Sequence, residues 1–144
     1  MKIEELLKEA SKLSYKLDAA LKEMKLPEEL YEIRYEFESD MTQDDIIFYS
    51  NKLAKAFEHL NEAVNIIAYI NRDITGEYII HKDLYGKYGC SAITYSAGTP
   101  IEALIVDGEN QFWVQTTVEH NGNDYYLVRY PNVQLEGLKV RIRW

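Results

Sequence analysis

The first half of the chain has its apolar residues at helical spacing. Between residues 3 and 24 they recur in alternating steps of three and four, and they do so again between residues 46 and 70. This is the pattern of helices that pack along one stripe. The first stripe is Ile3, Leu6, Ala10, Leu13, Leu17, Ala20 and Met24, and the second is Ile46, Tyr49, Leu53, Ala56, Leu60, Ala63, Ile67 and Ile70. Because the two stripes match, we expect an antiparallel helical hairpin.

Local signals mark the ends of these helices. Pro27 is expected to stop the first helix, and Thr42 with Asp45 forms a variant of the capping box before the second. The intervening residues, 28–39, fit two patterns. Apolar residues alternate with charged ones over 31–37, as in a strand, whereas a proline followed by two glutamates is a typical helix start. We favour the helix, which would extend the hairpin into a small bundle.

Near Asn71 the hydrophobic period changes to two. Short alternating runs at 76–81, 101–106, 112–119, 125–130 and 139–143 predict strands, and the segments between them are rich in turn residues. The sequence HNGND, 120–124, is expected to close a hairpin, and 131–137 to form a short turn or 3₁₀ segment. The sequence therefore predicts an α+β protein, with a helical hairpin or small bundle over 1–72 and a small antiparallel β-barrel over 73–144.

Alternation also assigns faces to the strand at 112–119. Phe112, Val114, Thr116 and Val118 point one way and form the expected core, while Trp113, Gln115, Thr117 and Glu119 point the other way. A tryptophan on a polar face is either a contact platform or is covered by the helices or a loop. Trp113, Gln115, Tyr126 and Tyr130 are the candidate protein-binding residues. Most tyrosines are expected to pack in the barrel, and a Tyr–Trp groove for proline-rich or single-stranded ligands is an alternative.

The strand at 139–143 carries a basic stripe. Lys139, Arg141 and Arg143 share one face, and Leu138, Val140, Ile142 and Trp144 share the other. The stripe is the candidate binding site for nucleic acid or a small phosphorylated ligand, and such binding would be salt-sensitive and lost in Arg141→Glu. The alternatives are that the stripe is solvated or that it pairs with the acidic helices.

The net charge of the chain indicates which kinds of binding partner are favoured. The chain of 144 residues has a net charge of −8, of which −5 lies in residues 1–72 and −3 in residues 73–144. This balance disfavours binding to nucleic acid or to an anionic membrane and favours a basic protein partner. The single cysteine, Cys90, fits a reducing cytoplasm, and the charged N-terminus does not resemble a signal peptide. No apolar run approaches the roughly 20 residues of a membrane-spanning helix.

Catalytic and metal-binding motifs are missing from the sequence. The three histidines, His59, His81 and His120, are far apart and show no metal-ligand spacing. We find no G-x-S-x-G, H-E-x-x-H, phosphate-binding loop or dinucleotide fingerprint. Cys90 with a histidine could in principle form a nucleophile and base, but their spacing does not support it, and a packing cysteine is the favoured interpretation. We therefore expect a protein that is not an enzyme and needs no cofactor or metal.

Three motifs in the second half carry a resemblance. They are a glycine–small–proline–Ile–Glu segment at 98–102, a W-V-x-T-x-x-E-H-N-G-x-D-Y-Y hairpin at 113–126, and L-E-G-L-x-V-R-I at 135–142. Residues 76–143 thereby resemble the bacterial domain-of-unknown-function family 5348, and the strand order resembles SH3-like barrels. The resemblance implies an origin in Firmicutes, their phages or mobile elements, and brings no catalytic residue with it. SH3-like folds host binding more often than catalysis.

These observations favour a protein-interaction module. The expected partner is a host protein, basic in charge, and inhibition of a host defence protein is one form that the interaction would take. Binding of nucleic acid or a phosphorylated ligand is the alternative. The helical stripes could also pair between two copies of the chain, and light scattering at two protein concentrations would separate a monomer from a homo-oligomer.

Overall fold

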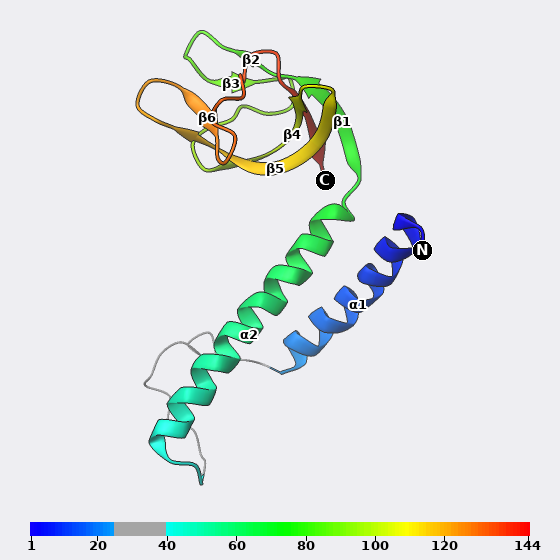
Figure 1. Cartoon of the computed structure of the whole chain (residues 1–144), viewed down its shortest axis with the longest axis vertical. Helices are drawn as coiled ribbons and strands as arrows, with labels where there is room; N and C mark the ends of the chain where they lie inside the picture. Colours follow the sequence, from blue (N-terminus) through cyan, green and yellow to red (C-terminus); the bar gives the residue numbers. More distant parts are fainter. Residues whose placement is uncertain (25–39) are drawn as a thin grey trace. The chain divides into compact units, whose positions relative to one another are not determined.

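The computed structural model describes residues 1–24 and 40–144. They divide into two compact units, Met1–Arg72 and Asp73–Trp144, and each is described by itself (Figure 1). The order of elements is α1 (Ile3–Glu23), α2 (Gln43–Ile70), β1 (Ile74–Ile79), β2 (His81–Lys82), β3 (Tyr88–Gly89), β4 (Thr99–Asp107), β5 (Asn110–His120), β6 (Tyr125–Leu127) and β7 (Lys139–Arg143). The predicted α+β class, with helices before an antiparallel sheet, is confirmed. The prediction for residues 28–39 lies outside the described residues.

The two helices run antiparallel. The side-chain amide of Asn71, at the end of α2, donates to the hydroxyl of Ser11, in the first half of α1, at 2.8 Å. The predicted cap of α2 is present, because the Thr42 hydroxyl accepts from the backbone N–H of Asp45 at 3.3 Å. Neither described helix combines the length and apolar character needed to cross a bilayer.

The predicted stripes match the buried faces of the helices only in part. Leu13 and Leu53 are 65% and 51% exposed, whereas the neighbouring Ser14 and Ala54 are buried. Ala10, Leu17, Leu60 and Ile67 of the stripes are partly buried, so the buried face overlaps each predicted stripe and differs from it at these two positions. Because serine and alanine are small, another part of the chain can approach the helix backbone closely at these points. Apolar spacing alone does not reveal this.

The second unit is built on a five-stranded antiparallel sheet in the order β1-β7-β4-β5-β6, accompanied by the two-stranded ladder of β2 and β3. The last strand thus lies between β1 and β4, and β1 and β6 form the two ends of the sheet. Closure of this sheet into a barrel stays a prediction. The strand expected at 125–130 ends at Leu127, since Arg129 takes a left-handed φ of 68° in the following turn.

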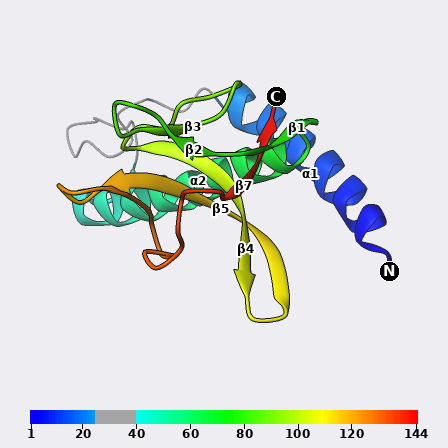
Figure 2. The ribbon, with the colours of Figure 1, turned by 90° about the horizontal axis from the view of Figure 1, so that it is seen from above.

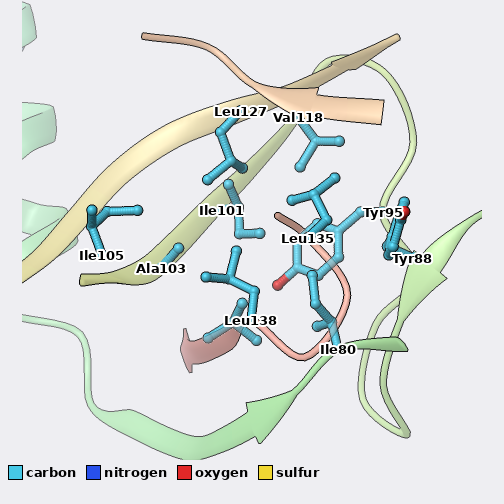
Figure 3. Close-up of a cluster of buried hydrophobic side chains, with 11 residues drawn as sticks. Ile80, Tyr88, Tyr95, Ile101, Ala103, Ile105, Val118, Leu127, Leu135 and Leu138 are labelled. Atoms are coloured by element: carbon cyan, nitrogen blue, oxygen red, sulfur yellow. The ribbon is translucent and has the colours of Figure 1, made fainter. Parts of the chain in front are cut away.

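The core of this unit lies against one face of the sheet (Figure 3). It consists of Ile80, Tyr88, Tyr95, Ile101, Ala103, Ile105, Val118, Leu127, Leu135, Leu138 and Val140, all buried. The predicted core face of β5 is right at Val118 and at Val114, which packs against this cluster, but wrong at Phe112, which is 41% exposed. Trp144 is 82% exposed, so the predicted apolar face of β7 also fails at its end.

Candidate interaction surface

The face of the sheet opposite the core carries a row of polar side chains. Strand register aligns Glu77 of β1, Arg141 of β7, Glu102 of β4 and Gln115 of β5. In an antiparallel sheet, residues directly opposite one another turn their side chains to the same face, at Cβ separations of about 4.5–5.5 Å. The two carboxylates therefore flank Arg141, one on each side.

Glu102 is the centre of this row. It is only 6% exposed, and its carboxylate accepts from both Arg141 and Arg143. The Arg143 Nε lies 2.8 Å from Oε2, and its Nη2 lies 3.3 Å from Oε1. A buried carboxylate held by two guanidinium groups ties β4 to β7 and fixes the positions of both arginine side chains.

Arg141 in turn covers Trp113. The guanidinium carbon lies 4.4 Å from the centroid of the indole ring, within the range of a cation–π contact. The sequence left open what contacts this ring, and the contact comes from within the same sheet. Trp113 remains partly exposed. The result is an aromatic side chain that is accessible and also held in one position.

The basic stripe of β7 is paired along its whole length. Lys139 forms an ion pair with Glu77 at 2.7 Å, and Arg141 and Arg143 share Glu102. The stripe has carboxylate partners within the sheet itself, Glu77 of β1 and Glu102 of β4. Two carboxylates stand against three cations, so most of the positive charge is offset at short range and the attraction to phosphate is reduced.

The candidate protein-binding residues separate into two groups. Tyr126 pairs with Glu119 in register, which places it on the same face as Gln115 and Trp113. Tyr130 instead packs against the core cluster. The face formed by Glu102, Trp113, Gln115, Tyr126 and Arg141 is called the Trp113 surface below.

A second polar network, which sequence reasoning missed, joins the β5–β6 hairpin to β2 and β3. The Asp124 carboxylate accepts from Lys82 Nζ at 2.9 Å and from the Tyr88 hydroxyl at 3.2 Å. The hydrogen bond from Lys82 lowers the pKa of Asp124, and the same bond raises the pKa of Lys82. Burial raises the pKa of Tyr88. The D-Y-Y segment of the hairpin motif was the available signal, but its partners lie about 40 residues away in the sequence.

Glu136 holds the loop before β7 in a similar way. Its carboxylate accepts from the backbone N–H of Lys82 at 2.8 Å and contacts His81 Nδ1 at 2.7 Å. The hydrogen bond with His81 lowers the pKa of Glu136. Gly137 follows with a φ of 77°, a left-handed conformation that favours glycine. The L-E-G-L motif is thus explained by the loop that it builds.

The remaining candidate groups stay separate. Cys90 is a free cysteine that packs against the core, His59 is largely exposed beside Glu62, and the His120 ring meets Tyr125 edge-to-face at 4.6 Å. Within residues 1–24 and 40–144, no three histidine, cysteine, aspartate or glutamate side chains are grouped as a metal site.

Residues from three separate motifs meet at the Trp113 surface. Glu102 belongs to the 98–102 motif, Trp113 to the hairpin motif, and Arg141 to the 135–142 motif. The motifs that carry the family resemblance therefore specify this network as well as the turns.

Comparison with known proteins identifies one family match. Neither the curated proteins nor the solved structures include a match to the chain. Residues 77–142 match the model of a family described as Domain of unknown function (DUF5348), over a span from Glu77 in β1 to Ile142 in β7. The C-terminal part of the chain is thus similar to this family of domains of unknown function.

Proposed function

We propose that the protein is a non-enzymatic interaction module that binds a basic protein partner through the Trp113 surface. One observation carries the proposal: the partly exposed Trp113 ring is held under Arg141, which Glu102 fixes from a buried position. Tryptophan, tyrosine and arginine are the residues most enriched at binding hot spots, and rigid side chains lose little entropy on binding.

Charge supports the choice of a basic partner. The chain carries a net charge of −8, and the carboxylates of the second unit outnumber its basic side chains by three. Long-range attraction of a basic protein would raise the association rate and make it sensitive to salt. Binding of phosphate groups by β7 is less well supported, because each of its three basic residues already has a carboxylate within ion-pair distance.

The setting that we propose is a cytoplasmic one in Gram-positive bacteria, where the protein of a phage or mobile element contacts a host protein. Inhibition of a host defence protein is the form of this function that the family's occurrence favours. The polar networks support a non-enzymatic role, because the shifted pKa values of Lys82, Asp124 and Glu136 arise from exposed pairs that hold loops together.

Affinity capture from a Gram-positive lysate tests this function. The chain is expected to retain a basic host protein, and Trp113→Ala to lose it. The matched control is Trp144→Ala, which removes the second tryptophan of the chain from a position that is 82% exposed. Capture by Trp113→Ala that equals capture by the unmodified chain would rule out the proposed surface, provided that circular dichroism shows the variant to be folded.

A further inference from the structure

Strand β4 has an edge that β7 does not cover. It pairs with β5 along its entire length, from Thr99 to Asp107, but with β7 only at Glu102 and Ala103. Residues 105–107 therefore have a strand on one side only. Figure 2 shows the β4–β5 hairpin extending away from the other strands of the sheet.

The carbonyl of Leu104 and the backbone of Val106 face this edge. The carbonyl of Thr117 accepts from the N–H of Val128, so Thr117 directs its backbone groups away from β4. Backbone groups alternate along an antiparallel strand, so Thr116 bonds towards Ile101, and Ile101, Ala103 and Ile105 bond towards β5. Glu102, Leu104 and Val106 then point the other way. The pairing of Ala103 with Val140 directs the Leu104 N–H to the backbone of Lys139, so the Leu104 carbonyl and the backbone groups of Val106 are those that face the edge beyond β7.

A groove lies next to this edge. It has a volume of about 390 Å³, and its lining includes the apolar side chains of Leu104, Val106, Val133 and Leu138. A volume of this size lies within the range of about 300–1,000 Å³ that is usual for ligand sites. Leu104 is also the register partner of Trp113, so the groove borders the Trp113 surface. Unpaired strand edges beside apolar pockets are where extended peptides add to a sheet.

The charges around the groove are mostly negative. Glu136 and Lys139 line it, and Asp107 and Glu109 lie at the tip of the β4–β5 hairpin. Lys139 is already paired with Glu77 at 2.7 Å. Glu136 is likewise already bonded to His81 and to the Lys82 N–H. An added strand would therefore meet the carboxylates of Asp107 and Glu109 without an unpaired cation of the groove lining, which favours lysine or arginine side chains in the ligand.

We infer that this groove binds an extended peptide of the partner, with alternating apolar and basic side chains, which adds as a strand beside Leu104–Asp107. The inference rests on the proposed function, since it identifies the part of the partner that the surface recognises. Main-chain hydrogen bonds to the Leu104 carbonyl and to the N–H and carbonyl of Val106 would provide affinity, and the apolar groove would select the side chains that point into it.

Amide NMR of the full chain tests the inference with a capped heptapeptide of alternating lysine and valine. We expect chemical-shift changes at Leu104 and Val106, slower hydrogen exchange at the amide of Val106, and weaker binding at higher salt. The matched peptide of alternating glutamate and valine should bind at least about tenfold more weakly. Changes confined to other parts of the chain, or equal binding of both peptides, would overturn the inference.

A pair of variants separates backbone pairing from general hydrophobic contact. Val106→Pro removes the outward N–H at a position that is 62% exposed, where an edge strand tolerates proline. Its affinity for the lysine–valine peptide should fall about tenfold or more, whereas Val106→Thr, which keeps the N–H, should stay within about twofold. Equal affinities contradict strand addition, and if Val106→Pro does not fold, the amide map of the unmodified chain decides.

The two proposals can fail separately. Lysate capture that is lost in Trp113→Ala but kept in Val106→Pro would support the proposed function and refute the groove. Peptide binding at Leu104 and Val106 without capture of a host protein would support the groove and refute the proposed partner.

Discussion

The helical unit and the β unit bury their apolar residues to very different degrees. In the described part of the helical unit, Ser14 and Ala54 are the buried residues, and large apolar side chains such as Leu13, Leu53 and Ile66 are more than half exposed. The β unit buries eleven residues in one cluster. The difference indicates that the β unit has a core of its own, whereas the exposed stripes of the helices are surfaces that another chain or segment could cover.

The largest loss of stability is expected when Glu102 of the β unit is substituted. Glu102→Gln removes the charge that Arg141 and Arg143 share in a buried position, and breaking such a pair costs about 3–5 kcal/mol of unfolding free energy. Urea unfolding followed by tryptophan fluorescence measures this in the β unit, because both tryptophans of the chain, Trp113 and Trp144, lie there.

Glu77→Gln is the matched control for that variant. Glu77 and Lys139 have side chains that are 45% and 44% exposed, so their ion pair is worth less than about 1 kcal/mol. Equal losses in the two variants would show that the burial of Glu102 does not matter.

The difference in burial between the two units can be tested with Leu127→Ala in the β unit and Leu13→Ala in the helical unit. Leu127 is fully buried, and its truncation should cost about 2–5 kcal/mol because a cavity forms in the core. Leu13 is 65% exposed, so its truncation should change the unfolding free energy by less than about 0.5 kcal/mol. Circular dichroism at 222 nm during urea unfolding would follow both variants. A large loss in Leu13→Ala would mean that this helix face is covered in solution.

The smallest expected effect is a pH dependence of the β unit. The ordinary pKa values of Asp124 and Glu136 are 3.8 and 4.5, and the hydrogen bonds from Lys82 and His81 lower them in the folded chain. Groups with a lowered folded pKa stabilise the fold above the ordinary value, and this contribution is lost as the pH falls through the lower folded values. The urea concentration at the unfolding midpoint, recorded by tryptophan fluorescence, should therefore decrease once the pH is below about 4.5. The decrease should be smaller in Asp124→Asn. A midpoint that falls equally in both proteins would exclude Asp124 as a source.

Much of the fold could be predicted because its signals are local. The change of period near Asn71, the cap at Thr42 and the strand at Lys139–Arg143 are all present in the structure. Burial within the helices could not be predicted, because apolar spacing marks Leu13 while tertiary packing covers Ser14. The left-handed Arg129, which ends β6 early, has no signal in the side-chain pattern.

The sequence predicted Trp113 and Arg141 as candidate site residues, but it did not predict the contacts between them. Alternation placed Trp113 and Arg141 on polar faces, yet their contact depends on the order β1-β7-β4-β5-β6, which brings β7 beside β4. Glu102 looked like an ordinary part of a strand, because no pattern in one sequence shows which carboxylate will be buried between two arginines. Long-range register was therefore the missing information.

The place of β7 between β1 and β4 also orders events during translation. Residues 74–127 can be synthesised and their hairpins formed, but the two parts of the sheet join only once the ribosome has delivered Lys139–Arg143. Until then the nascent β unit lacks the strand that joins β1 to β4, and with it the arginines that pair with Glu102. The helices are synthesised first, and during this interval they are attached to a β unit that is still incomplete.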